Sequence, residues 1–362
     1  MSANPSPLTT MSSLLLPELP AVRDSQHYIS DANTVLLVDR TLFRVHRSML
    51  TKDNSSFEEM FSLDEVHGKF DQPLDGQDDD NPIHLQGDTA DEIRALLWSL
   101  YALPAELHQF STPTDPDFDI LRFIQLARIA HKYQFRSTER WALQVLVAYT
   151  KRIELQNTAH LEQLTEVAAL CACQELLNDA VARWKVLLHQ GRDVAIAIRL
   201  GERLGLKKLT GLAYNKMMII GRSTWDADTA LTRSQKIRLL SGYYTLSHLC
   251  DLLPSRPPTF AHDSSCVVTH CCVNTWSNLW ELLTTDQEGG FSEQVTKHQP
   301  GDLLGRVIMA ESILKALVEY DIPRNGIMDG MHEMCAELAL KAVQKKVRDV
   351  QKQLAECFVD VE

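Results

Sequence analysis

The sequence has no long apolar run and comparatively little positive charge. None of its 362 residues lie in a stretch approaching the ~20 apolar residues of a membrane-spanning helix. The run at residues 12–16 is too short for a signal-peptide core and follows no basic leader, so we expect an intracellular protein, cytoplasmic or nuclear. With 36 Lys and Arg against 48 Asp and Glu, the net charge of −12 argues against direct binding to nucleic acid or an anionic membrane.

The sequence motifs of several common enzyme classes are also missing. It contains no glycine-rich phosphate loop, no Gly-x-Ser-x-Gly, no His-Glu-x-x-His and no Cys-x-x-Cys. His46 follows a predicted strand, and no nucleophile or carboxylate stands beside it in the sequence to complete a site. We therefore interpret His46 as a structural histidine at a strand-to-helix corner.

The most informative segment is residues 34–61. Two short apolar runs, at 35–38 and 42–45, flank Asp39-Arg40-Thr41, which predicts a β-hairpin. His46-Arg47-Ser48 then leads out of the second strand. Asn54-Ser55-Ser56 precedes an apolar-periodic segment, and this is typical of a helix start. The predicted order is therefore strand, turn, strand, helix, helix.

This order resembles the opening of a BTB/POZ domain, and the chain is most similar to the BTB domain-containing proteins of higher fungi. A third strand at 82–85, a helix at 88–101 and a last helix at 120–133 continue the resemblance over roughly 28–149. The residues that match the family's motif are Phe43, His46, Arg47, Leu50, Phe57 and Phe61.

The resemblance implies an α+β fold in which helices cover a small sheet, followed by an all-helical C-terminal region. It also implies a non-catalytic scaffold or adaptor that binds protein partners and self-associates. Together with the missing enzyme motifs, the resemblance predicts that the protein is not an enzyme, and the one cofactor we consider is the structural zinc described below. Many BTB dimers use an Asp just before the first strand, whereas this chain has Asn33, so dimer geometry does not transfer. As an interaction surface we expect the exposed positions around the hairpin: Asp31, Asn33, Asp39 and Arg40.

A second function stays open beside the first. BTB adaptors of cullin-3 ubiquitin ligases carry an apolar-x-Glu motif shortly after the Met-Phe pair. Leu63-Asp64-Glu65 has this pattern, two residues earlier than usual. The resemblance therefore allows cullin-3 as a partner.

Composition predicts five segments. Prolines at 5, 7, 17 and 20 indicate a disordered segment at 1–26, ahead of the BTB-like domain at 27–150. A helical extension at 151–253 follows, with apolar residues at spacings of three and four. A proline- and cysteine-containing linker at 254–275 separates it from a C-terminal helical region at 276–362. The acidic stretch at 68–81 is interpreted as a solvated loop.

Cysteine and histidine cluster in the last third of the chain. Cys266 and Cys272 form one pair, and His332-x-x-Cys335 forms another. In a reducing cell such donors are thiols or metal ligands, and zinc takes four of them in a tetrahedron. The predicted structural zinc set is Cys266, Cys272, His332 and Cys335, with His270 or Cys271 as substitutes. The alternative is that the cysteines are free thiols, buried as small apolar side chains.

Overall fold

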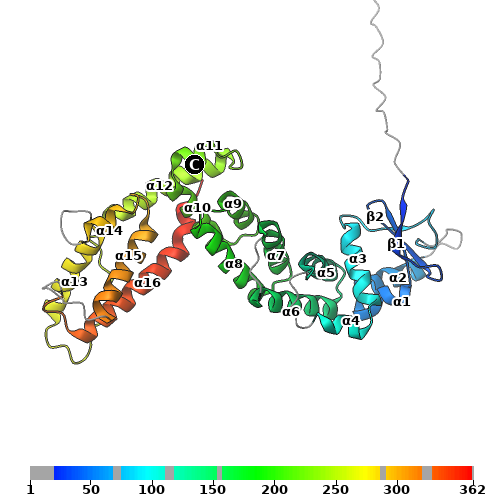
Figure 1. Ribbon diagram of the computed structural model, residues 1–362, viewed down its shortest axis with the longest axis horizontal. Helices are drawn as coiled ribbons and strands as arrows, with labels where there is room; N and C mark the ends of the chain where they lie inside the picture. Colours follow the sequence, from blue (N-terminus) through cyan, green and yellow to red (C-terminus); the bar gives the residue numbers. More distant parts are fainter. Residues whose placement is uncertain are drawn as a thin grey trace, which may run out of the picture. The chain divides into compact units, whose positions relative to one another are not determined.

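The computed structural model describes residues 20–67, 75–110, 118–152, 157–285, 291–319 and 328–360 (Figure 1). The fold is α+β, as predicted: a small sheet near the N-terminus is followed by many helices. The chain divides into two compact units, Met1–Leu177 and Asn178–Glu362, here called unit 1 and unit 2. Among the described helices, none combines the length and the apolar character that a membrane crossing needs.

The sheet of unit 1 has four strands in the order β1-β3-β2-β4. The predicted hairpin is confirmed: β2 and β3 pair antiparallel, and Asp39 makes the turn with φ at 50°. β1 pairs parallel with β3, and β4 pairs parallel with β2. The strand bounds are Val22–Tyr28 for β1, Thr34–Val38 for β2, Thr41–Val45 for β3 and Ile83–His84 for β4.

The helices of unit 1 begin directly after the hairpin, with α1 at Arg47. Further along the chain, the start of α3 is fixed by a capping box between Thr89 and Glu92, in which each side chain accepts a hydrogen bond from the other residue's backbone N–H. The helical bounds are α1 Arg47–Leu50, η1 Lys52–Asn54, α2 Ser56–His67, α3 Ala90–Tyr101, α4 Pro104–Gln109, α5 Ile120–Lys132, α6 Arg136–Arg152 and α7 Thr158–Leu170, with α8 Gln174–His189 crossing into unit 2.

One continuous apolar core joins the sheet of unit 1 to its helices. Phe43 and Leu50 are fully buried, and Phe57 is 1% exposed. The Phe57 ring stacks on Tyr133 at 4.5 Å between centroids, which holds α2 against the end of α5. Four of the six motif residues, Phe43, Leu50, Phe57 and Phe61, lie in this core.

The regular secondary structure in the described residues of unit 2 is all helical. Helix α16 packs against α10, α12 and α15, and its buried face carries Val343, Val347, Val350 and Leu354 at spacings of three and four. Its approach to α10 is close, because a Cβ on Gly211 would lie 2.6 Å from the backbone N of Ala355. The bounds are α9 Val194–Arg203, α10 Lys207–Ile220, α11 Arg222–Ala227, α12 Arg233–Leu252, α13 Thr269–Thr284, α14 Ser292–Thr296, α15 Leu303–Glu319 and α16 Glu333–Cys357.

Three predicted boundaries differ from the structure. β1 starts at Val22, inside the segment 1–26 predicted to be disordered, because its backbone finds a partner in β3. The division near residue 150 falls instead after Leu177, since α7 packs on α5 and shares its core. The predicted linker 254–275 ends early, because α13 already begins at Thr269.

The acidic loop predicted at 68–81 is only partly described. Residues 68–74 lie outside the described residues. In the remainder, Asp79 accepts a 2.6 Å hydrogen bond from the Tyr28 hydroxyl and pairs with Arg23 at 2.7 Å. This acidic turn is therefore tied to β1 rather than fully solvated.

Candidate functional site

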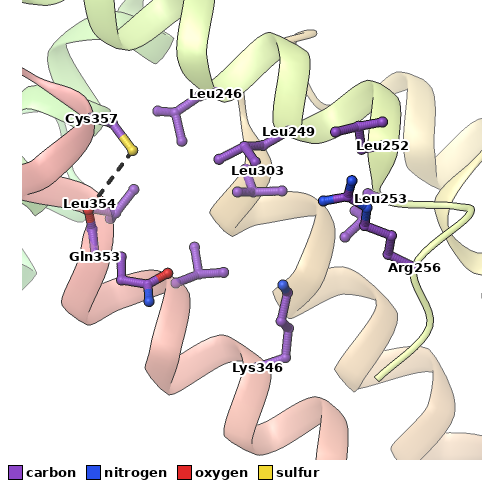
Figure 2. Close-up of a pocket in the computed structure, with 11 residues that line it drawn as sticks. Leu246, Leu249, Leu252, Leu253, Arg256, Leu303, Lys346, Gln353, Leu354 and Cys357 are labelled. Atoms are coloured by element: carbon purple, nitrogen blue, oxygen red, sulfur yellow. Dashed lines mark hydrogen bonds between the residues drawn. The ribbon is translucent and has the colours of Figure 1, made fainter. Parts of the chain in front are cut away.

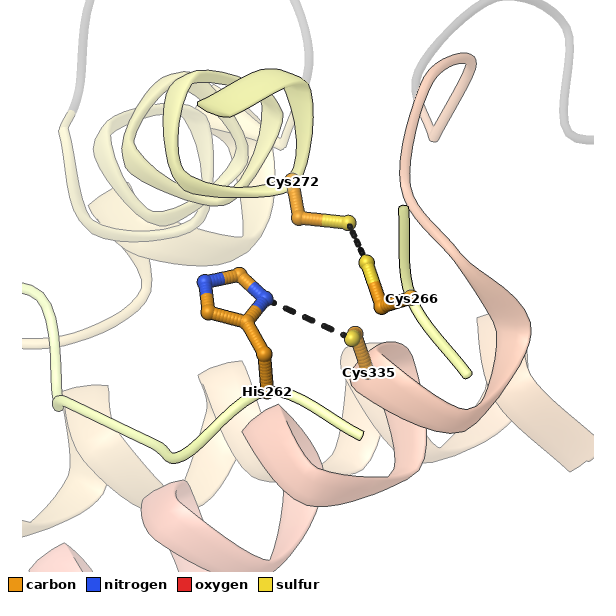
Figure 3. Close-up of side chains that lie close together, drawn as sticks. All are labelled: His262, Cys266, Cys272 and Cys335. Atoms are coloured by element: carbon orange, nitrogen blue, oxygen red, sulfur yellow. Dashed lines mark hydrogen bonds between the residues drawn. The ribbon is translucent and has the colours of Figure 1, made fainter. Parts of the chain in front are cut away.

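Four metal-ligating side chains converge within unit 2. Cys272 lies in the first turn of α13 and Cys335 in the first turn of α16, while His262 and Cys266 come from the segment before α13. Figure 3 shows the four side chains pointing toward one another. Their ligand atoms all lie within 4.8 Å of one another, so three separate segments of the chain meet at this point.

The distances inside this cluster, called the Cys3His cluster, form two close pairs. The Sγ atoms of Cys266 and Cys272 are 3.5 Å apart, and Cys335 Sγ is 3.5 Å from His262 Nδ1. A disulfide would bring two Sγ atoms to about 2.05 Å, so all these cysteines are free. Cys266, Cys272 and Cys335 are buried, and His262 is half-buried.

Local structure fixes each donor. The Asp263 carboxylate accepts a 2.9 Å hydrogen bond from the Ser265 backbone N–H, and the Asp263 carbonyl accepts one from the Cys266 N–H at 3.0 Å, which makes a tight turn before Cys266. Behind the cluster, the Trp276 indole N–H donates to the Pro258 carbonyl at 2.8 Å. Phe260 packs edge-on against both Trp276 and His262, which positions the imidazole.

The cluster also has a hydrogen-bond donor aimed at sulfur. The backbone N–H of His332 donates to Cys272 Sγ at 3.2 Å. Burial raises the pKa of the Cys272 thiol to about 11; the His332 N–H lowers this pKa, and the nearby Cys266 and Cys335 raise it. Without a cation the thiol therefore stays protonated at neutral pH, and metal binding would release its proton.

The structure brings the three predicted cysteines together, but the histidine beside them is His262 rather than the predicted His332. His332 is the N-cap residue of α16, and only its backbone reaches the cluster, so His262 takes the fourth place. The substitutes His270 and Cys271 are exposed, and His270 Nε2 lies 3.4 Å from the Asn274 amide instead. A signal for His262 existed in the His-x-x-x-Cys spacing to Cys266, but the spacing alone does not distinguish it from His332.

The strand-to-helix corner at His46 is fully bonded. The Tyr101 hydroxyl accepts from the His46 backbone N–H at 2.9 Å and also lies 3.0 Å from His46 Nδ1, where the imidazole tautomer decides which group donates. The remaining ring nitrogen, Nε2, lies 3.7 Å from the Asp31 carboxylate, which the sequence did not place beside it. Burial raises the pKa of Tyr101, which disfavours a phenolate nucleophile at this corner.

Arg47, the residue after His46, links the same corner to α2 and to the residue before β2. Its guanidinium donates to the Phe61 carbonyl at 3.1 Å and lies 4.3 Å from the centroid of the Phe61 ring. The same residue's backbone N–H donates to the Asn33 side chain at 2.9 Å. His46 and Arg47 therefore connect the hairpin, α2 and α3, which is a structural role.

The four residues predicted as an interaction surface are all exposed. Three of them also make internal bonds. Asn33 accepts from Arg47 as described, Asp39 accepts from the Ala90 N–H at the start of α3 at 3.3 Å, and Arg40 donates to the Pro20 carbonyl at 3.3 Å. Leu63, Asp64 and Glu65, the residues of the cullin-3 motif, lie in the last turns of α2, and their side chains are outside the described residues.

Unit 1 contains a second, smaller group of titratable side chains. His131 Nδ1 lies 3.0 Å from the Glu139 carboxylate, and Cys171 lies close to both. Burial raises the pKa of Cys171 to about 12, and Glu139 adds to this effect. The group offers three donors, one of which is the protonated thiol of Cys171, whereas a structural zinc site has four donors.

Two pockets lie among the described residues, one in each unit, and Cys171 lines the pocket of unit 1. One of about 120 Å³ in unit 2 is lined mainly by leucines of α12 together with Leu303, Lys346 and Leu354 (Figure 2). This volume is below the roughly 300–1,000 Å³ of small-molecule sites. A larger pocket of about 530 Å³ in unit 1 includes Arg140, Lys151 and Glu175, and the last two already pair with each other.

Comparison with known proteins assigns nothing further: no family model, no curated protein and no solved structure matches the chain.

Proposed function

We propose that this chain is a non-catalytic protein-interaction protein that self-associates through a BTB-like domain formed by unit 1. The observation that carries the proposal is the arrangement of the motif residues. Phe43, Leu50, Phe57 and Phe61 share one core, and His46 and Arg47 tie the hairpin to the helices that follow. All six motif residues thus have a structural task in the same compact unit, which is what the resemblance requires.

The absence of a reactive arrangement at His46 supports a binding role over a catalytic one. Its imidazole is hydrogen-bonded to the Tyr101 hydroxyl, whose pKa is raised. The carboxylate of Asp31 is solvent-exposed, with 80% of its side chain accessible. A general base needs an adjacent nucleophile whose proton it can take. The hydroxyl nearest to the His46 imidazole is that of Tyr101, and it already accepts a hydrogen bond from the His46 backbone N–H.

The proposed contact surface includes the tip of the β2–β3 hairpin. Asp39 and Arg40 are exposed there, and Arg40 contacts only the Pro20 carbonyl among the interactions described above. The edge strand β1 is less suited to pairing with a second copy, because its register with β3 shifts between Arg23 and Tyr28. Such irregular edges discourage strand addition.

Size-exclusion chromatography with light scattering tests self-association. We expect a mass of twice the 40.9 kDa chain that falls toward the single-chain value on dilution. Arg40→Glu reverses one charge at the hairpin tip and should weaken the dimer. Arg136→Glu reverses another exposed charge, at the start of α6, and should leave the dimer unchanged.

A single-chain mass at every concentration would overturn the proposal. Equal effects of Arg40→Glu and Arg136→Glu would keep self-association but remove the hairpin from the contact surface.

A further inference from the structure

We propose that His262, Cys266, Cys272 and Cys335 bind one zinc ion in a closed, structural site within unit 2. This inference does not depend on the function proposed for unit 1. It concerns other residues, in the other compact unit, and a different chemistry.

The spacing of the donors fits a tetrahedral ion. Zinc–sulfur bonds of about 2.3 Å place the sulfurs of a tetrahedron about 3.8 Å apart, and a sulfur–nitrogen edge is slightly shorter. The Sγ atoms of Cys266 and Cys272 are 3.5 Å apart, and Cys335 Sγ and His262 Nδ1 are 3.5 Å apart. Two edges of the tetrahedron are thus nearly formed, and small rotations of side chains complete the others.

The donor types select zinc. Three thiols and one imidazole are soft or borderline ligands, whereas calcium and magnesium require oxygen donors. No carboxylate belongs to the cluster. Three thiolates and one zinc ion leave a net charge of −1, and the His332 N–H at 3.2 Å from Cys272 Sγ offsets part of it. Four protein donors also fill the tetrahedron, so no position stays open for a substrate or a catalytic water.

Burial of free thiols as small apolar groups does not account for the whole cluster. It would explain the buried Cys272 and Cys335, which are 0% exposed. A thiol–imidazole hydrogen bond accounts for the contact between His262 Nδ1 and Cys335 Sγ (Figure 3), but it gives no reason for the Cys266–Cys272 pair to lie within 4.8 Å of both atoms. A shared cation gives one, because it draws all four donor atoms toward the same point.

Metal analysis of protein purified without a histidine tag is the direct test. We expect one zinc per chain. Cobalt exchanged for zinc should give the intense thiolate charge-transfer absorption and the visible bands of a tetrahedral ion. Zinc removal by a chelator should increase hydrogen exchange at the starts of α13 and α16 and leave unit 1 unchanged, because no donor comes from unit 1.

Matched pairs of variants assign the ligands. His262→Ala should lose the zinc, and His332→Ala should keep it. Cys272→Ser should lose it, and Cys271→Ser, which changes the exposed neighbouring thiol, should keep it. Because His262→Ala could also misfold, His262→Cys supplies a second test: it should retain one metal per chain, with the cobalt spectrum shifted toward four thiolates.

Some outcomes would overturn the inference. The first is a protein that contains well under one zinc per chain and binds no added zinc or cobalt. If its thiols also react freely, the cluster is a group of free thiols and not a metal site. Loss of metal in His332→Ala with retention in His262→Ala would reject this ligand set. Failure of the dimer experiment on unit 1 would leave all of these measurements unaffected.

Discussion

Replacing Phe57 with alanine tests whether one aromatic cluster holds α2 to the rest of unit 1. The ring is 1% exposed and stacks on Tyr133 with 4.5 Å between centroids. The ring centroids of Phe61 and Phe135 each lie 6.2 Å from the centroid of the Phe57 ring. Phe61 is on the same helix, and Phe135 immediately precedes α6. Removal of the ring therefore leaves a cavity between α2, α5 and the segment that leads into α6.

The expected cost follows from this burial. A fully buried Phe→Ala change costs about 3–5 kcal/mol, and aromatic pairing supplies about 0.5–1.5 kcal/mol beyond the buried area. Phe57→Leu fills part of the cavity but removes the ring contacts, so we expect roughly 1–2 kcal/mol. Leu103→Ala is the control, because Leu103 is 66% exposed and exposed substitutions change stability by about 0.5 kcal/mol or less.

Hydrogen exchange read by mass spectrometry is the suitable assay. A chain with two compact units does not guarantee a single unfolding transition, and peptide-resolved exchange reports the opening free energy of each unit separately. Peptides from β2, β3, α2 and α5 should exchange faster in Phe57→Ala, and those from α12 to α16 should not change. The reasoning is refuted if Phe57→Ala and Leu103→Ala lower the opening free energy of unit 1 equally.

Two further predictions concern one site in each unit. In α12, Gly242→Ala should destabilise unit 2 by about 1–3 kcal/mol rather than stabilise the helix, because the new Cβ would lie 2.1 Å from the Phe358 ring; a raised melting temperature would contradict this. In β1, burial lowers the pKa of His27 from its usual 6.5, and the Asp24 carboxylate partly offsets this shift. Below pH 6.5 the unfolded chain therefore binds more protons than the folded chain. The free energy of unfolding then falls as the pH drops toward the pKa of folded His27. His27→Gln should flatten the acid limb of a plot of denaturation midpoint against pH, and an unchanged slope would rule out this contribution.

The elements encoded by local signals were predictable from the sequence. The hairpin was found because apolar runs flank a turn, and α12 and α16 because their apolar positions repeat at helical spacing. β1 was missed for a physical reason. Its two inward-facing residues are Asp24 and His27, and polar side chains give no apolar alternation. Burial of Asp24 depends on Arg94, 70 residues later, whose guanidinium donates to it at 2.8 Å.

The metal cluster shows the same limit. Cysteine is rare enough that the three thiols could be chosen from spacing, and the structure brings them together. The choice between His262 and His332 depends on the path of the chain after α12. Phe260 and Trp276 fix that path, and their contact spans α13 and the segment before it. No spacing rule contains this information, because it arises from tertiary packing.

Helix α16 has a consequence for the order in which the protein can fold as it is synthesised. Unit 1 is complete once Leu177 has left the ribosome, so its core can form while the second half is still being translated. In contrast, α10, α12 and α15 all pack on α16, and Cys335 stands in its first turn. The core of unit 2 therefore cannot close until α16 has been synthesised, and until then these apolar faces stay uncovered and open to chaperones.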